Sequence, residues 1–283
     1  MSDDILRALV DADGWMLDVD GCLVRTASAG GAGGVVIPGA ADLIGWLRRR
    51  GRKFIVCTNA SQKSAKHYAD HLRWLGLDIE DHEFMTAATA AAAHIARHHP
   101  GAMTLAIGDS GLEDALSQFG VEMIGPGGRL AEVVVVGAAD TYSAAAINAA
   151  CLAIADRGAS FYVSVDTPWF YGGVGRSVSV STAIAAAISS VTGQRPQVCG
   201  KPSPAIGEVL REHLGGEPGK IVIVGDMASI EMRLARQMGA LGVLVMSGGT
   251  SPGELDNLPS HDCPHLHIAD VGALFELLQR AAP

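Results

Sequence analysis

Two acidic residues one position apart, Asp18 and Asp20, follow a short apolar run that begins at Trp15. The run 15–17 is typical of a buried strand, and Gly21 allows the backbone to turn sharply after it. Two carboxylates at a strand end could bind a hard cation such as Mg2+, and one could attack phosphorus while the other moves a proton. An Asp-Gly pair is also a strong hairpin signal, so this stretch alone leaves turn and active site equally open.

Three further stretches carry side chains suited to the same chemistry, each after a predicted strand or in a loop beside one. They are Thr58-Asn59, Gly200-Lys201-Pro202, and Gly225-Asp226 with Glu231 beyond it. Together they would supply hydroxyl and amide donors, a fixed cation and a metal-binding acid, which phosphoryl transfer requires. Taken singly, Thr58 could be only a helix cap, Lys201 only a solvated cation and Asp226 only a turn residue.

The elements that must position these residues alternate along the chain. Apolar runs predict strands over 15–17 and 53–57, and helical patterns predict helices over 40–50 and about 62–75. This alternation favours a parallel sheet. Because right-handed crossovers bring the carboxyl ends of parallel strands to one edge, we expect Asp18 and Thr58 to lie close together.

A second alternating unit interrupts this pattern after an alanine-rich helix, and the first pattern resumes with a buried strand over 221–224. We therefore expect a doubly wound, Rossmann-like parallel-sheet core with a smaller inserted α/β domain. The core would consist of residues 1–82 and 197–283, and the inserted domain of residues 83–196.

Composition narrows the class of protein and its partners. The 283 residues are 48% apolar and 18% charged, which predicts a globular protein with an ample core. A formal charge of -9 argues against nucleic acid or an anionic membrane as a partner. Five cysteines without a CxxC pair favour reduced thiols. Because the sequence also shows no secretion signal or membrane span, we expect a cytoplasmic protein, and a homodimer remains open.

Four ordered motifs carry a family resemblance: DVDGCL at 18–23, TNAS at 58–61, GKPSP at 200–204 and GDMASIE at 225–231. They resemble the motifs of the haloacid dehalogenase (HAD) superfamily. A long α/β insertion between the second and third motifs is similar to the nitrophenylphosphatase-like branch, subfamily IIA. The resemblance implies a HAD core with an α/β cap. It also implies a phosphatase for a small phosphate monoester, such as a sugar, glycerol or nucleotide phosphate.

The resemblance also implies roles for the acidic residues. Asp18 would be the nucleophile that forms an aspartyl-phosphate, and Asp20 would be the general acid and base. Mg2+ would be the cofactor, held by Asp18, the main-chain carbonyl of Asp20, and Asp226. A nucleophile must stay ionised while an acid must hold its proton, so the two carboxylates need different environments.

The remaining motif residues would bind the phosphoryl group. By the same resemblance, Thr58 and the backbone of Asn59 would hold phosphoryl oxygens near a helix start, where amides and the dipole favour anions. Lys201 would neutralise both Asp18 and the phosphoryl group. A small-molecule phosphate ester is then the expected partner. The alternatives are a non-hydrolytic sensor of phosphometabolites and a phosphotransferase with an acceptor other than water.

The sequence departs from the family pattern in two places. Glu231 stands where the family usually has Asp, so we expect it behind the metal ligands, and it leaves the metal affinity in doubt. The predicted cap segment 164–177 offers Asp166, Trp169 and Arg176 as candidate substrate-binding residues. Its aromatic triplet could form an apolar wall, or could pack the cap on the core.

A zinc site near the end of the sequence is disfavoured. His261, Cys263, His265 and His267 are close in sequence, but their spacing fits no common zinc site.

Overall fold

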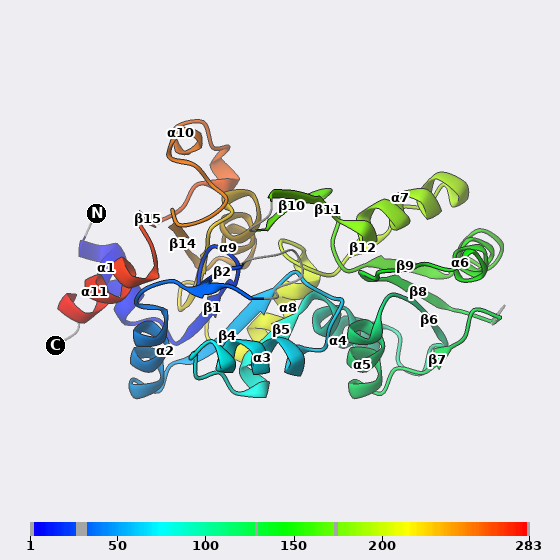
Figure 1. Cartoon of the computed structure of the whole chain (residues 1–283), viewed down its shortest axis with the longest axis horizontal. Coiled ribbons are helices and arrows are strands. Elements are labelled where there is room, and N and C mark those ends of the chain that lie inside the picture. The colour runs from blue at the N-terminus through cyan, green and yellow to red at the C-terminus, as the bar shows by residue number, and fades with distance from the viewer. Residues whose placement is uncertain (1–2, 27–32, 128–129, 173–174, 282–283) are drawn as a thin grey trace.

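Two parallel sheets lie side by side along the molecule, each covered by helices (Figure 1). The computed structural model describes residues 3–26, 33–127, 130–172 and 175–281. The side chains of residues 171–176 also lie outside this description. The predicted α/β fold with parallel sheets is confirmed.

The larger sheet has six strands in the order β15-β14-β13-β1-β4-β5, and all neighbouring pairs are parallel. Its strands are β1 (Gly14–Leu17), β4 (Lys53–Thr58), β5 (Phe84–Thr86), β13 (Ile221–Gly225), β14 (Leu241–Val245) and β15 (Leu266–Ile268). Because β1 lies between β4 and β13, Asp18 emerges beside the ends of both neighbours.

Helices cover both faces of this sheet because the side chains of a buried strand alternate between two apolar layers. Trp15 and Leu17 pack on one face, and Met16 packs on the other. The first layer contains α1 (Asp3–Val10), α2 (Ala40–Arg49), α3 (Ala65–Trp74) and α11 (Val271–Ala281). The second contains α4 (Ala87–His98), α8 (Pro204–Leu214) and α9 (Arg233–Met238).

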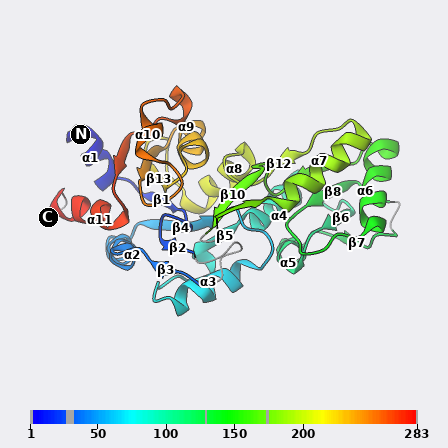
Figure 2. The ribbon, with the colours of Figure 1, turned by 45° about the horizontal axis from the view of Figure 1, so that its top comes forward.

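The smaller sheet has five parallel strands in the order β12-β9-β8-β6-β7. The strands are β6 (Thr104–Ile107), β7 (Met123–Ile124), β8 (Val133–Val136), β9 (Ser160–Val163) and β12 (Gln197–Val198). Helices α6 (Ala144–Arg157) and α7 (Val180–Thr192) cover one face. Helices α4 and α5 (Ser110–Gln118) cover the other, so α4 packs on both sheets (Figure 2).

Local signals fix where several of these helices begin. Ser203 caps α8 by accepting a hydrogen bond from the Ile206 amide, and Pro204 occupies the first turn. Thr86 and Thr89 form a capping box at the start of α4. Helix α8 therefore starts three residues after Lys201, which holds that lysine close to a rigid element.

Short elements complete the chain. Two antiparallel ribbons are β2 (Val24–Arg25) with β3 (Val35–Val36), and β10 (Trp169–Gly172) with β11 (Gly175–Val178). The helical turns are η1 (Asp81–Glu83), the π-helical η2 (Ala228–Met232), α10 (Pro252–Leu255) and η3 (Ser260–Asp262). Every helix in the described ranges is too short or too polar to cross a lipid bilayer.

The chain passes from one sheet to the other a few residues later than the predicted boundaries between the core and the inserted domain. The boundary expected after residue 82 falls before β5, which still extends the larger sheet, and the one expected after residue 196 falls before β12, which still extends the smaller sheet. Strands of two or three residues show no readable periodicity, so only their pairing partners reveal them. The division into a core and a cap domain remains our proposal.

Candidate active site

The chain turns tightly where Asp18 and Asp20 leave β1. Gly21 has a φ of 75°, and the Leu23 amide donates to the Val19 carbonyl at 2.9 Å. Strand β1 pairs only in parallel with β4 and β13 among the described residues. The Asp-Gly pair therefore forms a turn that presents two carboxylates at the sheet edge, and not a hairpin returning along β1.

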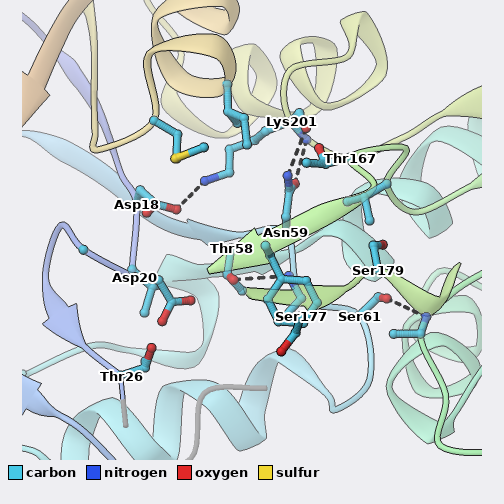
Figure 3. A pocket seen from close by; sticks show the side chains of 18 of the residues that line it. Asp18, Asp20, Thr26, Thr58, Asn59, Ser61, Thr167, Ser177, Ser179 and Lys201 are labelled. Carbon is cyan, nitrogen blue, oxygen red and sulfur yellow. Dashed lines mark hydrogen bonds and ion pairs between the residues drawn. The ribbon is translucent and has the colours of Figure 1, made fainter. Parts of the chain in front are cut away.

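Lys201 lies at the centre of the site, with only 2% of its side chain exposed. Its Nζ donates a hydrogen bond to Oδ1 of Asp18 (Figure 3). The same nitrogen lies 2.9 Å from both Oε1 of Glu231 and the Cys57 carbonyl oxygen. Burial alone would lower the pKa of Lys201, but Asp18 and Glu231 hold it well above its ordinary value. Lys201 is thus a fixed cation beside Asp18.

Glu231 directs its carboxylate toward this lysine. It belongs to η2, and its Oε2 accepts a hydrogen bond from the Met227 amide at 3.1 Å. A Cβ at residue 225 would overlap the Glu231 side chain, so Gly225 makes room for the longer acid. Burial is the main reason why the pKa of Glu231 rises to about 7. The expected place behind the metal ligands remains a prediction, and the observed partner is Lys201.

Glycines surround the Asp226 carboxylate on two sides. A Cβ at Gly21 or Gly248 would overlap its Oδ2, and the Gly249 amide donates a hydrogen bond to the same oxygen. Burial, followed by the charges of Asp18 and Glu231, raises the pKa of Asp226 well above its ordinary value. This carboxylate therefore lies in a pocket where a further positive charge would stabilise it.

The loop after β4 brings Thr58 and Asn59 to the same edge. Thr58 is buried, and its Oγ1 accepts a hydrogen bond from the Ala60 amide at 3.2 Å. The Asn59 side chain donates to the Lys201 carbonyl at 3.0 Å and accepts from the Lys201 amide at 2.8 Å. Asn59 thus clamps the backbone of Lys201, a role that the sequence did not predict for its side chain.

Asp20 lies in an environment different from that of Asp18. Burial raises its pKa to about 6, and a hydrogen bond with the Thr26 side chain acts in the opposite direction. Figure 3 shows Thr26 beside Asp20 and away from Lys201. Thr26 was not among the site residues predicted from the sequence. The only signal in the sequence was that a residue with a hydroxyl group ends the loop that begins with Asp18 and Asp20.

A cavity of about 920 Å3 opens over these groups and extends to the smaller sheet. Trp169 and Phe170 of β10 line it and are 43% and 41% exposed, so they are not buried packing between the two sheets. Asp166 is exposed and absent from the described lining, and its charge helps to raise the pKa of Arg233. The side chain of Arg176 lies outside the described residues.

The acidic groups fit a hard divalent cation. Asp18, Asp226 and Glu231 are buried around one lysine, so negative charge exceeds positive charge in a region of low dielectric. All of these acids offer oxygen donors, which Mg2+ prefers over nitrogen or sulfur. Asp226 lines the cavity, so such an ion could reach its carboxylate.

Comparisons with known proteins agree with this geometry. A family model described as haloacid dehalogenase-like hydrolase matches residues 15–122, and a second, described as HAD-hydrolase-like, matches residues 198–274. These segments carry Asp18, Thr58, Lys201 and Asp226. The chain belongs to the haloacid dehalogenase-like hydrolases, and the resemblance of its four motifs is confirmed.

Individual relatives identify the branch of this family. The ribonucleotide monophosphatase NagD of Escherichia coli K12 is 26% identical, over 86% of this chain and 90% of its own length. The p-nitrophenyl phosphatase of Archaeoglobus fulgidus is 26% identical with a TM-score of 0.82, covering 94% of this chain and 99% of that one. A glycerol phosphate phosphatase of Mycobacterium tuberculosis, solved with magnesium, has a TM-score of 0.82 at 23% identity over 97% and 77%. The branch is the nitrophenylphosphatase-like one, subfamily IIA.

Proposed function

We propose that this chain is a Mg2+-dependent phosphatase that hydrolyses a small phosphate monoester through an aspartyl-phosphate on Asp18. The observation that carries the proposal is the buried Lys201, whose Nζ contacts the Asp18 carboxylate at the sheet edge. A lysine held there pairs with the Asp18 carboxylate and would offset the charge of an incoming phosphoryl group. The relatives, which are phosphatases of small substrates, support the same reaction class.

The reaction would proceed in two displacements. In the first, a carboxylate oxygen of Asp18 attacks phosphorus, and the ester oxygen leaves with the proton of Asp20. In the second, the ionised Asp20 takes a proton from water, which attacks phosphorus, releases inorganic phosphate and restores Asp18. The pKa of Asp20, raised to about 6, suits a group that alternates between acid and base.

Mg2+ would be held by Asp18, Asp226 and the main-chain carbonyl of Asp20, and it would offset the negative charge of the phosphoryl oxygens. Lys201 would add a second positive charge beside the nucleophile. Glu231 holds the ammonium group of Lys201 in place. Thr58 and the backbone of Asn59 would donate to phosphoryl oxygens. The catalytic set is therefore Asp18, Asp20, Thr58 and Lys201.

The leaving group would be uncharged and carry both hydroxyl and apolar surface. Among the described residues that line the cavity from the smaller sheet and its connections, only Asp140 is charged. The others include Trp169, Phe170, Ser177 and Thr167. Hydroxyls and apolar rings suit a polyol or an aromatic alcohol better than a second anion. Arg176, expected to bind an anionic group, remains a prediction.

The decisive measurement is phosphate release across a panel of phosphomonoesters by the full chain, with Mg2+ and after EDTA treatment. We expect Mg2+-dependent release that falls by at least about a thousandfold in Asp18→Asn, because no nucleophile remains. Asp11→Asn, an exposed acid in the turn before β1, is the matched control and should keep full activity.

Other outcomes would point elsewhere. Saturable binding of esters without release by the native chain would indicate a sensor. Product that appears mainly as a new ester when alcohols are added would indicate a phosphotransferase. Equal activity in Asp18→Asn and the native chain would contradict the aspartyl-phosphate mechanism.

A further inference from the structure

We propose that His94, His98 and Glu208 form a second cation site, for Zn2+ or a similar transition-metal ion, which fastens α4 to α8. The site is separate from the acidic pocket: it lies where α4 and α8 pack together, and none of its residues lines the cavity over Asp18. Among the described residues, this is the one group of three His, Cys, Asp or Glu residues whose ligand atoms all lie within 4.8 Å of one another.

Two of the three distances between the ligand atoms are close to those around one tetrahedral ion. Nδ1 of His94 and Nε2 of His98 lie 3.6 Å and 3.4 Å from Oε2 of Glu208, and all three atoms fall within 4.8 Å of one another. With zinc–ligand bonds of about 2.0–2.1 Å, tetrahedral geometry separates neighbouring ligand atoms by roughly 3.3–3.4 Å. The three residues therefore need only small movements to bind one ion.

The helix geometry supplies the two imidazoles. His94 and His98 are four residues apart on α4, so they lie on the same face one turn apart, with ring centroids separated by 4.2 Å. Glu208 projects from α8 toward both rings. Two nitrogens and one carboxylate favour Zn2+, Ni2+ or Co2+ over Mg2+, which prefers oxygen ligands.

One ligand atom has no hydrogen-bond partner among the described residues. Nδ1 of His94 is buried and makes no hydrogen bond in the described structure. A buried polar atom without a partner costs free energy, and a metal bond would satisfy it. The other two ligands, His98 and Glu208, are each 44% exposed. An ion could therefore enter from solvent, and water could occupy the fourth position.

The ion would join two segments that connect the sheets. Helix α4 follows the last strand of the larger sheet before the chain enters the smaller one, and α8 follows the loop of Lys201 (Figures 1 and 2). Arg97 and Glu212 form an ion pair between the same helices. Tyr162 of the smaller sheet packs edge-on against His94. A bound ion would thus stabilise the junction of the two sheets.

Co2+ serves as the test ion because its visible absorption reports tetrahedral coordination. We would titrate the EDTA-treated full chain with Co2+ in excess Mg2+, which competes for the acidic pocket. We expect one Co2+ per chain with a tetrahedral spectrum, displaced by Zn2+. His98→Ala and Glu208→Gln, both at exposed positions, should weaken Co2+ binding at least about tenfold, because each removes one ligand.

Two controls separate this site from others. His82→Ala removes an exposed histidine outside the group, and Cys263→Ser tests the Cys and His residues near 261–267. Both should bind Co2+ like the native chain. The proposal is overturned if the native chain shows no saturable Co2+ binding, or if His98→Ala and Glu208→Gln bind Co2+ as tightly as the native chain. Loss of binding in Cys263→Ser alone would place the ion elsewhere and equally reject it.

Discussion

Asp18 and Asp20 are two carboxylates at one strand end with different surroundings. Asp18 accepts a hydrogen bond from a buried ammonium group, whereas Asp20 hydrogen-bonds with the Thr26 hydroxyl. Asp20 is buried and has no cation hydrogen-bonded to it among the described contacts, and its burial raises its pKa to about 6. The pair therefore has the difference in surroundings that a nucleophile and an acid require.

This difference predicts the pH dependence of the proposed reaction. Asp20 must be protonated to act as the acid, so the competent fraction is high below pH 6 and falls about tenfold per pH unit above it. We expect kcat/KM to decrease with pH on this limb. Thr26→Val removes a hydrogen bond that lowers the pKa of Asp20, so the limb should move to higher pH by up to about one unit.

The measurement is a pH profile of kcat/KM for the native chain and Thr26→Val. Thr192→Val, at the end of α7, is the matched control, because among the described contacts its hydroxyl bonds only to the nearby Ile188 carbonyl and Gln194 amide. A profile of Thr26→Val that coincides with the native one would contradict the assignment of this limb to Asp20.

At the scale of elements, the site depends on loops that follow neighbouring strands. Ser247, after β14, donates a hydrogen bond to the Gly21 carbonyl at 2.6 Å and so joins that loop to the turn after β1. Gly248 and Gly249 then pass close to Asp226, at the end of β13. Residues without side chains allow this close approach.

The loop after β14 offers a direct test of metal binding. A methyl group at Gly248 would overlap Oδ2 of Asp226, so Gly248→Ala should displace this carboxylate. We expect the Mg2+ concentration for half-maximal activity to rise at least about tenfold. Gly253→Ala is the matched control, because a Cβ there has no neighbour within 4 Å.

Mg2+ titrations of activity, with thermal unfolding curves for each variant, would measure this effect. If Gly248→Ala folds and needs no more Mg2+ than Gly253→Ala, Asp226 does not bind the metal as proposed.

At the scale of the whole molecule, the two sheets contribute different parts of the proposed active site. The larger sheet carries Asp18, Thr58 and Asp226 at its edge, and the ribbon β10–β11, connected to the smaller sheet, covers the cavity. Ser61 joins the two parts, because its hydroxyl accepts from the Ala138 amide at 2.9 Å. We infer that the larger sheet determines the chemistry and the ribbon selects the leaving group.

This division predicts selective effects for a ribbon variant. Phe170→Ala removes an aromatic ring from the cavity wall, so KM for 4-nitrophenyl phosphate should rise about tenfold, in line with about 1.5 kcal/mol for a lost apolar contact. KM for glycerol phosphate should change by less than about twofold, because its leaving group offers little apolar surface.

Steady-state kinetics with both esters would measure the selectivity. Phe119→Ala, at the end of α5 and 38% exposed, lies outside the described cavity lining and serves as the control. If Phe170→Ala changes KM equally for both esters, the ribbon does not select the leaving group.

The sequence by itself determined the local features of this protein. Alternating apolar runs predicted the parallel strands because each buried strand has a readable periodicity, and the motifs placed Asp18, Thr58 and Asp226 at strand ends and Lys201 in a loop beside the sheet. Their convergence followed from the rule that parallel strands end at one edge. The ribbon β10–β11 and strand β12 were not predicted, because the conformation of such short segments depends on their pairing partners.

Only the tertiary structure decided which side chains meet. Lys201 and Asp18 are 183 positions apart in sequence, and nothing local indicates that Glu231 turns to Lys201 or that Asn59 clamps the backbone of Lys201. Likewise, the histidines of α4 gain their Glu208 partner only because α8 packs beside them. Periodicity reports how a segment is buried, whereas contacts between distant segments depend on the packing of whole helices and sheets.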